Sequence, residues 1–195
     1  MKHLLLITIL FTHISSLSAA LKIGDSAPMT AYSMSDISGK EVSLESVAKE
    51  NGVLVIFSCN TCPWVIAWED RYNAVSETAS KNGIGTIFVN SNSSNHNGKD
   101  SLKAMKAHAK EKQYNVLYAL DTNNQLADAF GAQKTPDVFL FNKDSKLVYK
   151  GAIDDNARKP ENITENYLIN ALNAVGSGKS VPVNTTKSLG CGIKR

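Results

Sequence analysis

The sequence predicts an α/β fold in which a mixed central β-sheet is flanked by helices. Continuous apolar runs at 53–58 and 84–89 are typical of strands that are covered on both faces. Helical segments at 63–81 and 99–113 alternate with these runs, and such alternation places the strands parallel in one sheet. The 195 residues, 43% of them hydrophobic, are ordinary for one soluble globular domain.

The segment before the first buried strand is expected to add edge elements. We expect a first strand at 29–34 and a brief strand at 41–42, joined by a glycine-containing turn. Ser43 is a residue type that caps helices, and it precedes an expected helix at 44–49. An Asn-Gly pair then ends that helix.

The middle of the chain supplies the helices that cover the sheet. Pro63 is tolerated in the first turn of the helix at 63–81, because its missing N–H would be unpaired there anyway. A polar loop follows the second buried strand and leads into the helix at 99–113. The apolar stretch at 116–120 is expected to be a third parallel strand, and a glycine closes a short helix at 122–130.

The last third of the chain predicts a hairpin and a closing helix. Strands at 137–141 and 146–150 flank a polar turn, and an amphipathic helix follows at 163–175. We therefore expect one domain at 21–176 and a C-terminal tail at 177–195, which contains Gly, Ser and Pro.

The first twenty residues are typical of a secretory signal peptide. Lys2-His3 precede an apolar stretch at 4–11, and Ser18-Ala19-Ala20 form a small-residue cleavage pattern. The apolar stretch is far shorter than the roughly 20 residues that span a bilayer. We expect an exported protein, periplasmic or secreted, without stable membrane insertion after residues 1–20 are removed; an uncleaved membrane anchor is the alternative.

Cys59 and Cys62 follow the first buried strand, where the chain turns into a helix. Two thiols at this spacing can close a small disulfide ring and open it again. The first sulfur is expected at the helix N-terminus, where unpaired amide groups favour a thiolate. A structural disulfide is disfavoured, because closing so short a loop adds little stability. We expect Cys59 to be the exposed nucleophile with a lowered pKa and Cys62 to be the deeper, resolving thiol.

Other residues are weaker candidates for the site. Cys191 is the third cysteine, and it could be a second-stage redox partner, an intermolecular link or an inert thiol. His96 lies in the polar loop at the expected active-site edge, where it could relay a proton, although a solvated loop histidine is the alternative. The wet face of the first long helix is expected to carry four charges, Glu69, Asp70, Arg71 and Glu77.

The dithiol between a strand and a helix, followed by Thr135-Pro136, resembles the thioredoxin fold over about residues 21–175. Four stretches more narrowly resemble the secreted redoxin-type (AhpC/TSA-like) thioredoxin family proteins of bacteria. They are 57–64, 131–137, 149–155 and 189–194. The resemblance implies that Pro136 is cis beside the dithiol and that the backbone of Thr135 binds an extended substrate strand. Trp64 is a further candidate for substrate binding beside the thiols, with core packing as its alternative.

Two departures from thioredoxins proper limit this resemblance. The dipeptide between the thiols, Asn60-Thr61, is unlike theirs and shifts the redox potential, so reductant and oxidant roles both stay open. The other departure is a missing acid. Thioredoxins proper carry a buried acid in the strand before the dithiol, and Val53 stands at the corresponding place here. The proton of the second thiol must then pass through water or another group. The Pro-x-x-x-Thr-x-x-Cys pattern of peroxiredoxins is absent, because Val55 stands four residues before Cys59 and Cys59 stands three before Cys62.

The favoured function is an exported thiol–disulfide oxidoreductase that reacts with protein thiols and disulfides through a mixed disulfide. The alternatives are a thiol-dependent, antioxidant peroxidase and a copper-binding module that uses Cys59, Cys62 and His96. Copper chaperones of this fold space their cysteines one residue wider, which counts against the second alternative. We expect a monomer without a cofactor. We expect no nucleic-acid partner, because the net charge of +3 is small and not clustered.

Overall fold

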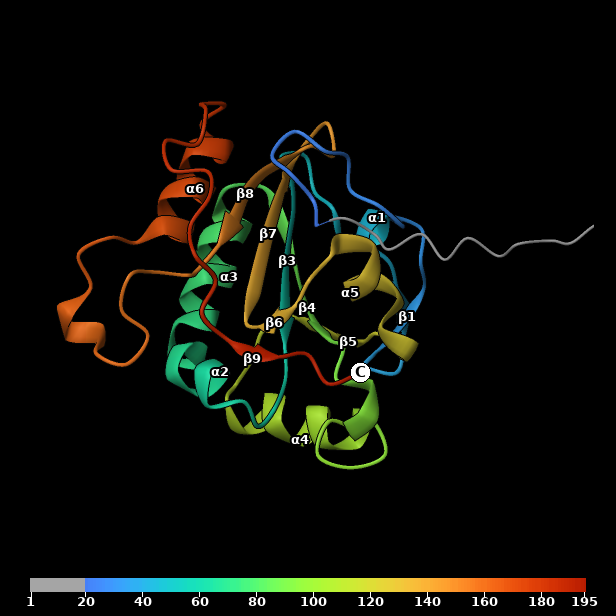
Figure 1. Cartoon of the computed structure of the whole chain (residues 1–195). Coiled ribbons are helices and arrows are strands. Elements are labelled where there is room, and N and C mark those ends of the chain that lie inside the picture. Colours follow the sequence, from blue (N-terminus) through green and yellow to red (C-terminus); the bar gives the residue numbers. More distant parts are fainter. Residues whose placement is uncertain (1–19) are drawn as a thin grey trace, which may run out of the picture.

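The computed structural model describes residues 20–195, so the predicted signal peptide lies, apart from Ala20, outside the described residues (Figure 1). The strands of this part are β1 Met34–Asp36, β2 Glu41–Val42, β3 Gly52–Ser58, β4 Ile84–Asn90, β5 Leu117–Leu120, β6 Lys134–Thr135, β7 Asp137–Asn142, β8 Leu147–Gly151 and β9 Cys191–Gly192. The α-helices are α1 Leu44–Val47, α2 Pro63–Trp68, α3 Tyr72–Lys81, α4 Leu102–Glu111, α5 Gln125–Phe130 and α6 Tyr167–Gly176. Short 3-10 turns are η1 Glu69–Arg71, η2 Ser93–Asn95, η3 Thr122–Asn124 and η4 Pro160–Asn162.

The predicted mixed sheet is confirmed. Within residues 20–195 it has seven strands in the order β2-β1-β5-β4-β3-β7-β8. Strands β3, β4 and β5 are parallel, as the alternation of strands and helices predicts. The hairpin of β7 and β8 adds antiparallel strands beside β3, and β1 adds one beside β5. The carboxyl ends of the three parallel strands therefore meet at one edge, where reactive groups usually gather.

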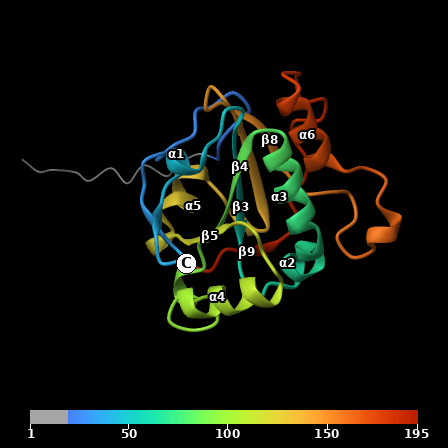
Figure 2. The same cartoon turned by 180° about the vertical axis from the view of Figure 1, so that it is seen from behind.

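Helices cover both faces of the sheet, which explains the continuous apolar run in β3. Val55 and Phe57 pack into one core cluster with residues of α1 and α5. Leu54 and Ile56, which point to the other face, pack into a second cluster with residues of α2, α3 and α6. Figure 1 shows the two groups of helices on opposite sides of the sheet, and Figure 2 shows α3 and α4 from behind.

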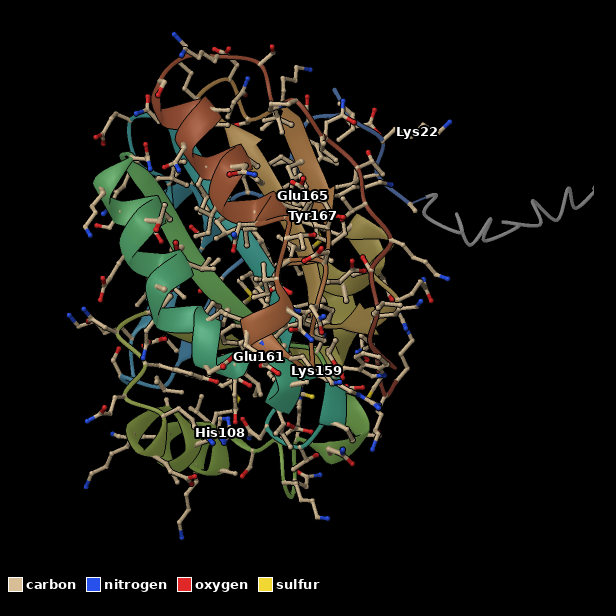
Figure 3. All side chains as sticks on the ribbon, turned by 90° about the vertical axis from the view of Figure 1, so that its left-hand side faces the viewer. Lys22, His108, Lys159, Glu161, Glu165 and Tyr167 are labelled. Atoms are coloured by element: carbon tan, nitrogen blue, oxygen red, sulfur yellow. A yellow bond between two sulfur atoms is a disulfide. The ribbon has the colours of Figure 1, made fainter. Side chains whose placement is uncertain are left out.

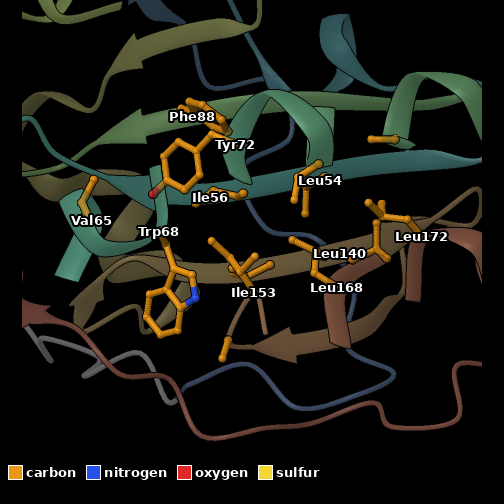
Figure 4. Packing of buried hydrophobic residues seen from close by; sticks show 14 of the residues in the cluster. Leu54, Ile56, Val65, Trp68, Tyr72, Phe88, Leu140, Ile153, Leu168 and Leu172 are labelled. Atoms are coloured by element: carbon orange, nitrogen blue, oxygen red, sulfur yellow. The ribbon is translucent and has the colours of Figure 1, made fainter. Parts of the chain in front are cut away.

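The second cluster holds α2 in place, and Figure 4 shows the buried side chains of this cluster from close by. Val65 and Trp68 of α2 are buried there together with Tyr72 of α3. The Tyr72 ring lies 4.5 Å from the ring of Phe88, measured between centroids. The element that follows the dithiol is thus held against the sheet by large apolar side chains.

The helices expected at 99–113 and 163–175 are shorter in the structure, as α4 and α6. Two other expected elements differ more. The first strand is β1 at Met34–Asp36 and not 29–34, because the preceding residues form turns, with Met29 at a φ of 51°. The expected helix at 63–81 is interrupted by η1. There Arg71 Nη1 donates to the carbonyl of Ala67, four residues earlier, at 2.5 Å.

Of the four charges expected on the wet face, Glu69 is buried and Arg71 is half-buried. Glu69 accepts hydrogen bonds from Lys112 Nζ at 2.7 Å and pairs with His108 Nε2 at 3.0 Å. Figure 3 shows His108 on α4, the helix that lies below this region. Arg71 Nε lies 3.0 Å from Asp154 Oδ2. The helix face is therefore covered by other elements, which its local sequence pattern does not reveal.

The C-terminal tail expected at 177–195 packs against the rest of the domain. It carries strand β9, and Ile193 just beyond it is buried in the core cluster of Val55 and Phe57. Figure 1 shows this red segment running from α6 to β9 beside β6 and ending near β5. None of the helices in residues 20–195 has the length and apolar character needed to cross a membrane.

Candidate active site

The dithiol lies where β3 ends and α2 begins. Cys59, Asn60 and Thr61 form a short loop, and Cys62 is the N-cap residue of α2. The Cys62 carbonyl accepts the N–H of Ile66 at 3.0 Å, which is the first hydrogen bond of the helix. Pro63 follows at the position that needs no N–H donor. The N-terminus of the helix was expected at Cys59, but it lies at Cys62.

Cys62 forms a disulfide with Cys191, across 129 residues of sequence and with 6.2 Å between the two Cα atoms. Cys59 is the free cysteine of the described chain. It is only 1% exposed, compared with 6% for Cys62. The expectation of an exposed Cys59 above a deeper Cys62 is wrong, because Cys59 packs into the core cluster and lies against the Thr135 side chain of β6.

The surroundings of Cys59 also correct the expected direction of its pKa. Burial raises the pKa of the Cys59 thiol, because the charged thiolate would lose its hydration. The Thr135 hydroxyl, 3.4 Å from the sulfur, and backbone hydrogen bonds from Cys62 and Thr61 act in the opposite direction. The negative charge of Asp100 adds to the effect of burial, and the net result is a raised pKa.

Thr135 and Pro136 lie beside the dithiol, and the peptide bond between them is cis, as the resemblance implies. The carbonyl oxygen of Thr135 lies 3.2 Å from the Cys62 sulfur. The strand β6 that contains Thr135 is paired with β9, so that Thr135 lies opposite Cys191. The edge at which a substrate strand was expected is occupied by the tail of the same chain.

Asp100 is a buried residue of the site that the sequence reasoning missed. Its carboxylate accepts hydrogen bonds from the Asn60 N–H at 2.9 Å and from the side chains of Asn90, Asn92 and Asn95 at 2.9–3.2 Å. Burial alone would raise the pKa of Asp100, but these donors outweigh it and lower the pKa. The asparagine-rich loop before Asp100 was a usable signal, because amides that surround a carboxylate can satisfy its charge.

Trp64 packs against the core cluster that contains Cys59 and Cys62, and His96 lies at the end of η2. The Trp64 ring lies 6.1 Å from that of Trp68, and the Arg158 guanidinium lies 5.1 Å from its centroid. His96 follows η2, and its backbone N–H donates to the Ser93 carbonyl. Burial lowers the pKa of His96, against an opposing hydrogen bond that the His96 ring donates to the backbone carbonyl of Asn90. Among residues 20–195, no group of three or more His, Cys, Asp or Glu side chains could hold a metal ion.

Solved structures share the fold of this chain. An uncharacterized conserved protein from Geobacillus kaustophilus is 31% identical over 89% of this chain and 92% of its own, with a TM-score of 0.82. A peroxidoxin from Mycobacterium tuberculosis is 13% identical over 79% of this chain and 97% of its own, with a TM-score of 0.62. The thioredoxin domain of a thiol-disulfide oxidoreductase from Bacteroides vulgatus is 20% identical over 68% of this chain and 90% of its own, with a TM-score of 0.56. The last two likenesses confirm the thioredoxin-like fold.

The remaining comparisons concern sequence. No curated protein matches the chain. The Redoxin family model matches residues 22–168, which include both cysteines of the dithiol and the cis proline. The chain therefore belongs to the Redoxin family, and its fold is thioredoxin-like.

Proposed function

We propose that this protein is an exported thiol–disulfide oxidoreductase in which Cys62 forms the mixed disulfide with a protein partner and Cys59 resolves it. One observation carries the proposal. Cys62 is disulfide-bonded to a cysteine on an extended strand, and that strand is paired with β6 at Thr135. A protein substrate that adds a strand to the same edge would present its sulfur to Cys62 in the same way.

The position of Cys62 suits the attacking role. It is the N-cap residue of α2, at the positive end of the helix, although its side chain accepts no hydrogen bond from the helix amides. The helix dipole favours the thiolate, which is the nucleophile in disulfide exchange. Burial and Asp100 raise the pKa of Cys59, and they outweigh the backbone hydrogen bonds that its sulfur accepts from Thr61 and Cys62. The two cysteines therefore exchange the roles that their order along the chain suggested.

The exchange balances in two steps. The Cys62 thiolate attacks one sulfur of the partner disulfide, a Cys62–partner bond forms, and the second partner sulfur leaves as a thiolate that takes up a proton. Cys59 then loses its proton and attacks the Cys62 sulfur, which releases the first partner sulfur and forms a Cys59–Cys62 disulfide. The partner gains two electrons and the dithiol loses two. The reverse sequence oxidises a partner dithiol.

The Thr135 hydroxyl has a part in the second step. It lies 3.4 Å from the Cys59 sulfur and lowers the cost of the thiolate there. No buried acid stands in β3, and the buried acid of the site, Asp100, is held by amide donors and raises the Cys59 pKa. The proton of Cys59 therefore leaves to water or to the departing thiolate when the mixed disulfide has formed.

The sequence pattern supports export, and the structure is compatible with cleavage after Ala20. Residues 1–20 have the basic, apolar and small-residue pattern of a secretory signal. The Leu21 N–H donates to the Phe130 carbonyl at 3.2 Å, and the Leu21 side chain is buried. After cleavage behind Ala20, the new terminal amine of Leu21 could still donate this hydrogen bond to the Phe130 carbonyl. Amino-terminal sequencing of the protein from cell fractions tests export, with a terminus at Leu21 outside the cytoplasm as the expected result.

Turnover of a protein disulfide tests the activity. With a small-thiol donor, the wild-type chain is expected to reduce insulin disulfides, whereas Cys62→Ser and Cys59→Ser/Cys191→Ser lose turnover. The double variant, which lacks both thiols that can attack Cys62, is further expected to accumulate a mixed disulfide at Cys62. Turnover that survives in Cys62→Ser contradicts the proposal. Peroxide consumption with the same donor, in the absence of disulfide reduction, would favour the peroxidase.

A further inference from the structure

The C-terminal tail lies where an incoming peptide strand would pair. Strand β9 runs antiparallel to β6, with Cys191 opposite Thr135. The Ile193 N–H then donates to the Gln133 carbonyl at 3.0 Å. The tail thus makes the backbone contacts of an added strand and also places a cysteine sulfur on Cys62.

Contacts on both sides of β9 hold the tail without help from the disulfide. Ser188 Oγ donates to Asp137 Oδ1 at 2.7 Å before the strand. After it, the Ile193 side chain is 8% exposed in the core, and Arg195 pairs with Asp128 at 2.9 Å. Cys191 is therefore presented to Cys62 by the docked strand, and the disulfide is an addition to that docking.

The fit between β9 and β6 depends on one glycine. A Cβ atom on Gly190 would lie 2.7 Å from the Thr135 carbonyl oxygen and 2.9 Å from the Thr135 carbonyl carbon, which is too close for either atom to remain in place. A Cβ on Gly192 would meet nothing within 4 Å. The residue before the cysteine is thus restricted in size, whereas the residue after it is free.

All three cysteines of the described chain meet at Thr135. The Cys59 sulfur lies 3.4 Å from its hydroxyl, the Cys62 sulfur lies 3.2 Å from its carbonyl, and Cys191 is its partner across the ladder. Backbone hydrogen bonding also joins the Cys59 sulfur to Cys62. The free thiol therefore lies beside the disulfide that closes the site.

We propose that residues 188–195 are a built-in occupant of the peptide-docking edge and that Cys191 and Cys59 compete for Cys62. The Cys59 thiolate attacks the Cys62 sulfur, a Cys59–Cys62 bond forms, and Cys191 leaves as a thiolate that takes up the proton lost by Cys59. No net electrons are gained or lost, so the exchange needs no external oxidant or reductant. The Cys62–Cys191 disulfide keeps the tail bound to the edge of β6, whereas the Cys59–Cys62 disulfide allows the tail to leave that edge.

The proposal rests on the proposed function and adds a substrate class to it. An external substrate must take the place of β9, so it must be an extended segment with a cysteine opposite Thr135. The clash at Gly190 further selects a glycine before that cysteine. The preferred partner is therefore a protein with a Gly-Cys pair in an extended, displaceable segment.

Disulfide mapping of the full-length mature protein tests the competition. The reduced chain is equilibrated in a glutathione buffer, quenched with acid, alkylated and mapped by mass spectrometry. Wild type is expected to hold mostly the Cys62–Cys191 bond with a free Cys59, and Cys191→Ser is expected to form Cys59–Cys62. A wild-type chain in which Cys191 is alkylated throughout and Cys59–Cys62 dominates overturns the proposal.

Two matched glycine variants make the test specific for strand docking. Gly190→Ala should shift the ratio of the two disulfides toward Cys59–Cys62 by about tenfold, the loss expected for one or two backbone hydrogen bonds. Gly192→Ala should leave the ratio unchanged. If the two variants have the same ratio of Cys62–Cys191 to Cys59–Cys62, the proposal of a docked tail is overturned, even where insulin reduction is intact. If the ratios are as predicted but the protein does not reduce insulin, only the proposed function is overturned.

Discussion

Cys191 lies opposite Thr135 in the β6–β9 ladder, and this pairing brings the end of the chain onto the dithiol. The Thr135 carbonyl lies 3.2 Å from the Cys62 sulfur, which is bonded to Cys191. One residue thus contacts both the strand that closes the site and the sulfur that the strand covers. Access to Cys62 and docking of the tail are consequently linked.

Loosening the tail should expose it to proteolysis. Ile193→Ala truncates a side chain that is buried in the core, and such a truncation lowers the stability of the packed state by about 2–5 kcal/mol. We expect trypsin to cleave after Lys187 several times faster than in wild type under conditions that keep the disulfides reduced. Leu189→Ala, at an exposed position of the same tail, is the control and should cleave at the wild-type rate. Equal rates for the two variants would show that Ile193 does not anchor the tail.

The Cys59 thiol should titrate at high pH. In the oxidised wild type Cys59 is the free thiol of the described chain, so thiolate absorbance reports on it directly. Because burial raises its pKa, the midpoint should lie above the value of about 8.5 for an exposed cysteine. Oxidised Cys59→Ser should lack this step. A midpoint below about 8 would contradict the burial of Cys59.

The raised pKa of Cys59 also affects stability. A folded-state pKa above the unfolded value means that the folded state holds the proton more tightly. The contribution is therefore fully present below about pH 8.5 and is lost as the pH rises through the folded-state pKa. Urea unfolding of oxidised wild type against oxidised Cys59→Ser should show the difference shrinking only on the alkaline side.

Asp100 should matter for stability near neutral pH and little in acid. Asp100→Asn leaves an amide that cannot accept all the hydrogen bonds from Asn60, Asn90, Asn92 and Asn95, at a cost of about 2–4 kcal/mol. The pKa of Asp100 is lowered, so its contribution is present above the unfolded value of about 3.9 and is lost as the pH falls through the folded-state pKa.

Unfolding in urea at several pH values tests this prediction. The free-energy difference between wild type and Asp100→Asn should be full at pH 7 and shrink below about pH 4. Asp144→Asn, at an exposed position of the β7–β8 turn, should change the free energy of unfolding by less than about 0.5 kcal/mol. A difference that stays constant into acid would show that the Asp100 charge is not what the amides stabilise.

Removing Arg71 should destabilise the region around the α2–α3 junction. Arg71→Met leaves the buried Asp154 carboxylate without its cation, which costs about 3–5 kcal/mol for a buried pair. Trp68 Nε1, which donates to Asp154 at 2.9 Å, should then show a shift in indole fluorescence. Arg158→Met, which removes only the contact with the Trp64 ring, should cost about 1 kcal/mol or less.

The sheet could be predicted because its signals are local. The apolar run of β3 reports burial on both faces, and strand–helix alternation reports parallel strands. The dithiol could be found for the same reason, since both cysteines lie in one short segment. The cis bond before Pro136 came from the family resemblance and not from a local physical signal.

The closed state of the site depends on contacts between distant segments. The partner of Cys62 lies 129 residues away on a two-residue strand, which is too short to show any periodicity. Cys59 is buried in the core cluster and lies against Thr135 of β6, 76 residues later in the chain, so the exposure and pKa inferred from its place along the chain were wrong. Asp100 was missed because it follows a polar loop with no strand or helix pattern.

The reactivity of single-thiol variants tests the central claim most directly. The double variant Cys59→Ser/Cys191→Ser keeps only Cys62, and Cys62→Ser/Cys191→Ser keeps only Cys59. The second-order rate of each with a small peptide disulfide is measured at pH 7. We expect the Cys62 variant to react at least about tenfold faster, since Cys62 caps a helix and the Cys59 pKa is raised. An equal or faster reaction of the Cys59 variant would contradict the claim that Cys62 is the attacking thiol.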